Sequence, residues 1–100
     1  MIEYNIYFAL GGKHTDNAEQ VHLGKVLEKV CENFGGYSLQ KIQGGWKHQE
    51  VMIEEDSYRL TLMTDTEKND KLSSLSFYIQ RNFNQEEVLI TQNEVKVLNL

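Results

Sequence analysis

Apolar and polar residues alternate strictly over residues 2–10. Side chains of a β-strand point alternately to its two faces, so this pattern predicts a strand with one buried face. The residues expected to face a core are Ile2, Tyr4, Ile6, Phe8 and Leu10. Those expected on the opposite side of the strand are Glu3, Asn5, Tyr7 and Ala9.

A helical period follows over residues 17–33. The segment 16–19 resembles a capping box, and the glycines at 35–36 are suited to ending a helix. The stripe that recurs at three- and four-residue spacing predicts the buried face of this helix. We expect Cys31 to pack in the stripe as a small hydrophobe. The stripe consists of Leu23, Val26, Leu27, Val30, Cys31 and Phe34.

Two further strands are predicted over residues 37–48 and 50–64. The alternation of the first slips between Leu39 and Ile42, and we expect a bend or bulge at the glycines 44–45. The acidic run 54–56 interrupts the second strand and is compatible with a turn that splits it.

A second capping box at residues 64–67 and the spacing of Leu72, Leu75 and Ile79 predict a helix that ends near Phe83. A last strand is predicted over residues 87–91, and residues 95–100 are expected to add a short edge strand. The order β-α-β-β-α-β predicts one α+β domain over residues 1–100, a ferredoxin-like βαββαβ sandwich. Right-handed crossovers place both helices on one face of a four-stranded antiparallel sheet and leave the other face open.

Composition narrows the classes of function. Of the 100 residues, 40% are apolar and 25% are charged, which is typical of a globular domain. The net charge is −5, with the acidic excess mainly in the second half, which argues against nucleic acid as a partner. No apolar run is long enough to cross a membrane, and no export signal is visible at the N-terminus, so we expect a cytoplasmic protein.

No constellation of residues points to catalysis or to a cofactor. The one cysteine excludes an intramolecular disulfide and a multi-thiolate metal site within one chain. The spacing of His14, His22 and His48 does not predict convergence on a metal. The glycine loop 11–16 lacks the spacing of a phosphate loop and is better interpreted as a turn.

The open face of the sheet is the main candidate site. Arg59, Thr61 and Met63 are expected to join Tyr7 and its polar neighbours there. Three coverings stay open: water, a second copy of the chain, or a ligand. Trp46 is expected either to cap the core or to stand with His48 and Arg59 at the mouth of a groove.

Several short motifs resemble a bacterial family of uncharacterised domains of unknown function. They are the turn 34–39, the Gly45-Trp46 pair, the strand 58–62 and the segment 83–89, whose pattern is Phe-x-Gln-Glu-x-Val-Leu. The resemblance implies a ferredoxin-like fold and implies no activity or catalytic residue. Many members of that family look exported, and this chain departs from them.

The leading hypothesis is a non-enzymatic binding protein that associates through the open face, most simply as a homodimer of face-packed or edge-paired sheets. It rests on Tyr7 and Met63 among polar groups there. One alternative is a dimeric α+β barrel in which Tyr7, His48 and Arg59 line a pocket for a small anionic metabolite, because an arginine fork suits a carboxylate or phosphate. The other is a phage or mobile-element protein that inhibits a host protein through its acidic second half.

Overall fold

The computed structural model describes residues 1–9 and 16–100, and of residues 16–19 and 46 it describes the backbone alone. Six elements follow one another along the chain. They are β1 (Ile2–Ala9), α1 (Asp16–Phe34), β2 (Ser38–His48), β3 (Val51–Thr64), α2 (Asn69–Asn82) and β4 (Leu89–Glu94). The predicted βαββαβ order is therefore confirmed.

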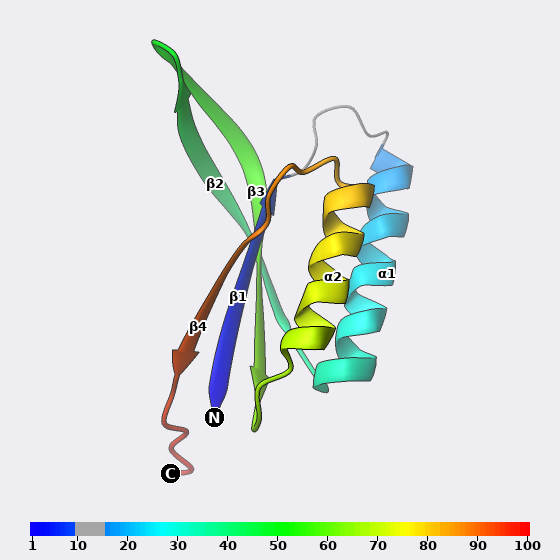
Figure 1. Cartoon of the computed structure of the whole chain (residues 1–100), viewed down its shortest axis with the longest axis vertical. Helices are drawn as coiled ribbons and strands as arrows, with labels where there is room; N and C mark the ends of the chain where they lie inside the picture. Colours follow the sequence, from blue (N-terminus) through cyan, green and yellow to red (C-terminus); the bar gives the residue numbers. More distant parts are fainter. Residues whose placement is uncertain (10–15) are drawn as a thin grey trace.

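The four strands form one antiparallel sheet in the order β2-β3-β1-β4. Both helices cover the same face, and none of the other described elements lies on the opposite face, as Figure 1 shows. The pairing of β1 with β3 ends at Ala9 and Ser57, whereas β2 and β3 stay paired out to His48 and Val51. The β2–β3 hairpin therefore projects beyond the rest of the sheet (Figure 1).

The core lies between the sheet and the helices. The even-numbered residues of β1 and β3 meet the apolar stripes of α1 and α2 there, as the alternation predicts. Ile6, Leu60, Ile79 and Phe83 are fully buried. The whole cluster is Tyr4, Ile6, Phe8, Leu23, Val26, Val30, Phe34, Tyr58, Leu60, Leu62, Leu72, Leu75, Ile79 and Phe83.

The predicted irregularities in the hairpin are wrong. The register of β2 and β3 runs without a bulge from Ser38 opposite Thr61 to His48 opposite Val51. The acidic residues 54–56 lie inside β3 and do not form a turn. The glycines 44–45 and the acidic run 54–56 break the apolar alternation for the same physical reason. This part of the hairpin extends past the core, so neither of its faces has to be apolar.

The predicted features of the two helices hold in part. α1 agrees with the expected span, but Cys31 is exposed, because the buried stripe narrows to Leu23, Val26, Val30 and Phe34. The capping side chains expected at residues 16–19 lie outside the described side chains. α2 begins later than predicted, with Lys68 as its N-cap and no side-chain cap hydrogen bond.

The end of the chain also differs from the prediction. The last strand is Leu89–Glu94, and residues 96–100 form no strand in the structure. The amide of Val95 still donates to the carbonyl of Met1, 2.9 Å away. The pairing of β4 with the start of β1 therefore continues one residue past the strand, to Val95.

Candidate functional site

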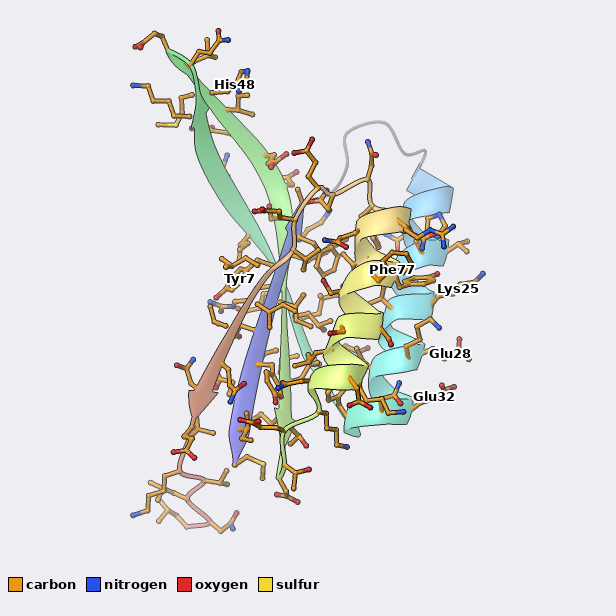
Figure 2. All side chains as sticks on the ribbon, in the orientation of Figure 1. Tyr7, Lys25, Glu28, Glu32, His48 and Phe77 are labelled. Atoms are coloured by element: carbon orange, nitrogen blue, oxygen red, sulfur yellow. The ribbon has the colours of Figure 1, made fainter. Side chains whose placement is uncertain are left out.

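The open face is organised in rows of side chains across the four strands. Because register partners lie on the same face, the pairings place Gln40, Arg59, Tyr7 and Leu89 in one row. The next row contains Ser38, Thr61, Asn5 and Thr91. Figure 2 shows Tyr7 on the side of the sheet away from the helices. Tyr7 and Arg59 are therefore direct neighbours, as their shared face predicted.

A chain of hydrogen bonds runs across this face. The hydroxyl of Thr61 donates to Asn5 Oδ1 at 2.7 Å, and Asn5 Nδ2 donates to Glu3 Oε1 at 2.8 Å. Asn5 is only 8% exposed although no element covers it. Buried amides need partners, and this chain supplies them on both sides of Asn5. The centre of the open face is thus held in a defined arrangement.

Arg59 is the positive charge at the centre of this face. Its Nη2 donates to Gln40 Oε1, and its Nε is buried without a hydrogen-bond partner. The ion pair formed by the described side chains joins Lys47 to Glu50. No carboxylate among the described side chains therefore forms an ion pair with Arg59. A half-buried guanidinium with a spare donor is a site that an incoming carboxylate or other anion would satisfy.

A groove of about 1030 Å³ lies at the end of the sheet nearest the hairpin, lined by open-face residues and also by Phe8, Gln80 and Ile90 from the helix side. Its floor includes Tyr7, Ala9, Ser57 and Gly44. A side chain at Gly44 would place its Cβ 3.3 Å from the hydroxyl of Ser57. The absence of a side chain at this glycine therefore leaves the groove open above Ser57.

The α2–β4 loop forms the wall of this groove. Gln85 fixes the loop to the end of β1, because its Oε1 accepts from the amide of Ala9 at 3.1 Å. Its Nε2 donates to the carbonyl of Phe83 at 2.8 Å. The lining includes Glu55, Glu86 and Glu87 and no described lysine, arginine or histidine. The groove is therefore acidic, in contrast to the Arg59 row beside it.

The structure separates the remaining predicted site residues. Met63 shares the face with Arg59, faces Glu3 across the strands and is 40% exposed. His48 lies near the tip of the hairpin, opposite Val51 (Figure 2). It stands eight residues of strand from Arg59, or about 26 Å. The backbone of Trp46 pairs with Ile53, and its side chain lies outside the described part.

The sequence interpretation missed the acidic groove. Alternation alone does not show that the strand with residues 54–56 and the loop with residues 86–87 meet. The glycines 44–45 carried a signal, since paired glycines inside a strand often mark a close approach. Among the described residues no group of three or more histidine, cysteine, aspartate or glutamate side chains could hold a metal ion. None of the described helices is long and apolar enough to cross a membrane.

The comparisons with known proteins bear on the fold. No protein-family model and no curated protein matches the chain. The family suggested by the short motifs is therefore not confirmed, and only the ferredoxin-like fold that it implied is supported. A phage SAM lyase in its apo state is 21% identical with a TM-score of 0.68, over 92% of this chain and 78% of that one. The phage SAM lyase in complex with S-methyl-5'-thioadenosine is 20% identical with a TM-score of 0.60, over 93% and 80%.

CutA1 from Pyrococcus horikoshii is similar to the chain as well. It is 14% identical with a TM-score of 0.58, and the match covers 99% of this chain and 87% of that one. At these identities the likeness shows a shared α+β, ferredoxin-like fold. It agrees with the sheet order and with the placement of both helices on one face.

Proposed function

We propose that the protein is a binding protein that self-associates through its open sheet face. The observation that carries the proposal is the charge pattern of that face. Arg59 and Glu3 both lie on it, two rows apart with the row of Asn5 and Thr61 between them, or about 13 Å along the strands. A two-fold axis through the face between them brings each Arg59 to the partner's Glu3.

The surroundings of these two charges support the same arrangement. Leu89 and Met63 are exposed at 62% and 40%, and Tyr7 lies beside Arg59 and lines the groove. The uncharged row of Asn5 and Thr61 already satisfies part of its own hydrogen bonding. A two-fold interface is self-complementary by construction, so one matched pair of charges is used twice.

A charge swap tests this proposal. Arg59→Glu or Glu3→Arg alone places like charges opposite each other and should weaken self-association at least tenfold in sedimentation equilibrium. The double variant Glu3→Arg, Arg59→Glu restores opposite charges and should recover most of the loss. Circular dichroism checks that each variant is folded. Single variants that associate like the wild type would refute the pairing.

The acidic groove favours a second candidate, a small-molecule-binding protein or enzyme of the SAM lyase kind. Three carboxylates and no described basic group line the groove, which suits an organic cation. SAM carries a positive sulfonium, whereas S-methyl-5'-thioadenosine is neutral. Two of the similar solved structures are of a phage SAM lyase, which motivates this choice of probes.

Thermal shift measurements with both compounds test the second candidate. SAM should raise the melting temperature of the wild type by several degrees and S-methyl-5'-thioadenosine by less, because it lacks the charge. Glu55→Gln should remove the SAM effect, while Glu32→Gln on the exposed side of α1 should keep it. If neither compound stabilises the wild type, the groove is not a site for this class of ligand.

A further inference from the structure

The two outer strands of the sheet differ in how their free edges are protected. The described strands leave the outer edges of β2 and β4 unpaired. β2 carries Lys41 and Lys47, and lysines on an edge discourage pairing with another chain. β4 has no lysine, and its single charged residue is Glu94. β4 is therefore the edge that is open to a further strand.

The hydrogen bonds of β4 show which backbone groups face outward. Val95 donates to the carbonyl of Met1, so these register partners form a hydrogen-bonded pair. In an antiparallel ladder such pairs alternate with pairs whose N–H and C=O groups point away. Ile90, Gln92 and Glu94 therefore turn their backbone groups to the free edge.

The tail that follows β4 is apolar and uncovered. Val97 and Leu98 are 48% and 63% exposed, and Leu100 is exposed as well. If the tail continues the alternation of β4, then Lys96, Leu98 and Leu100 share the helix side with Ile90. That side opens into a groove of about 450 Å³ between α2 and β4, lined in part by Leu72, Phe77 and Ile90.

We propose that β4 strands of two copies pair antiparallel about a two-fold axis at Val95. Each tail then extends β4 and lies along the partner's strand. In this register Lys96 faces the partner's Glu94, and Leu98 faces the partner's Gln92. Leu100 faces the partner's Ile90 and fills the groove beside the partner's Phe77, which stands exposed on α2 (Figure 2).

The charges select this register over its neighbours. A shift that places the axis at residue 94 sets Glu94 against the partner's Glu94. A shift that places it at residue 96 sets Lys96 against the partner's Lys96. Like charges directly opposite each other destabilise a strand pair, while opposite charges stabilise it. Only the axis at Val95, of these three, pairs glutamate with lysine.

This assembly goes beyond the proposed function, because it uses the edge of the sheet and not its open face. The two-fold pairing is closed and joins two sheets into one continuous sheet. Both open faces then lie on the same side of the joined sheet. A substitution that disrupts the open face should therefore leave the edge contact in place.

Cysteine cross-linking tests the register. In a Cys31→Ser background, which removes the native exposed thiol, Val95→Cys places two thiols on the axis. A non-hydrogen-bonded pair has Cα atoms about 4.5 Å apart, within the range of about 4.4–6.8 Å that a disulfide spans. The matched control Val97→Cys separates the thiols by about 13 Å. We expect at least tenfold more disulfide-linked dimer from Val95→Cys in a glutathione redox buffer.

Charge variants of the cross-linking protein separate the possible outcomes. Lys96→Glu should lower the yield from Val95→Cys, and Glu94→Lys combined with Lys96→Glu should restore it. Met63→Glu on the open face should leave the yield unchanged. Equal yields from Val95→Cys and Val97→Cys would overturn the register. A yield from Val95→Cys that is insensitive to Lys96→Glu would overturn the charge pairing that selects it.

Discussion

The two faces of one sheet are built from alternate residues of the same strands and have opposite characters. On the helix side, Ile6 and Leu60 are fully buried in a cluster of apolar side chains. On the open side, Asn5 is buried by its neighbours alone, and Arg59 keeps a buried Nε without a partner. The helix-covered face is buried within a single chain, while the open face retains a hydrogen-bond donor, Arg59 Nε, that a second molecule can pair with. This difference supports the proposal that the open face is a binding surface.

The largest effect should come from the helix-covered face. Leu60→Ala removes a fully buried side chain at the centre of the core and should lower the free energy of unfolding by about 2–5 kcal/mol. Met63→Ala, three residues further along β3 on the open face, should cost less than about 1 kcal/mol in the monomer. Urea denaturation at low protein concentration measures both. Equal losses would contradict the contrast between the faces.

An intermediate effect is expected in the hydrogen-bonded row. Asn5→Ala leaves the hydroxyl of Thr61 and the carboxylate of Glu3 without their shared partner. The expected loss in the free energy of unfolding is about 1–3 kcal/mol, because buried polar groups would be left unsatisfied. Thr61→Val in the Asn5→Ala background should cost little more, since its partner is already absent. Additive losses in this double-mutant cycle would show that the two residues act independently.

The smallest effect is expected in the groove wall. Gln85→Ala removes the acceptor for the amide of Ala9 and frees the α2–β4 loop from β1. We expect a cost of about 1 kcal/mol and faster hydrogen exchange at the Ala9 amide. Gln43→Ala on the exposed hairpin, whose Nε2 donates to Glu54 at 3.3 Å, is the matched control. Unchanged exchange at Ala9 in Gln85→Ala would show that this bond does not hold the wall.

Alternation and helical period were sufficient to predict the element order and the two faces. Tyr7, Arg59 and Met63 were placed on the open side because parity alone decides which face a strand residue takes. The start of α2 was not predictable in the same way. Thr64 looked like a cap, but it is the last residue of β3, and its hydroxyl donates to the carbonyl of Thr66. A local motif cannot show that its side chain is already used.

The candidate site was predictable only within single strands. The bond from Thr61 to Asn5 joins residues 56 apart, and it depends on the register of β1 with β3, which no local pattern encodes. The sequence analysis expected His48 and Arg59 to lie together at the mouth of a groove. The length of the hairpin separates them. The acidic groove likewise depends on the contact between Gln85 and β1.

Sedimentation velocity over a range of protein concentrations tests the central claim, that the open face is covered by a second copy. With Lys96→Glu present in every protein to weaken the β4 edge contact, the protein with the wild-type open face should associate, and the double variant Tyr7→Glu, Met63→Glu should remain monomeric at concentrations at least tenfold higher. Val21→Glu, at a 56% exposed position on α1, is the matched control and should associate like the protein with the wild-type open face. A protein with the wild-type open face that is monomeric throughout, or a double variant that associates equally well, would contradict the account.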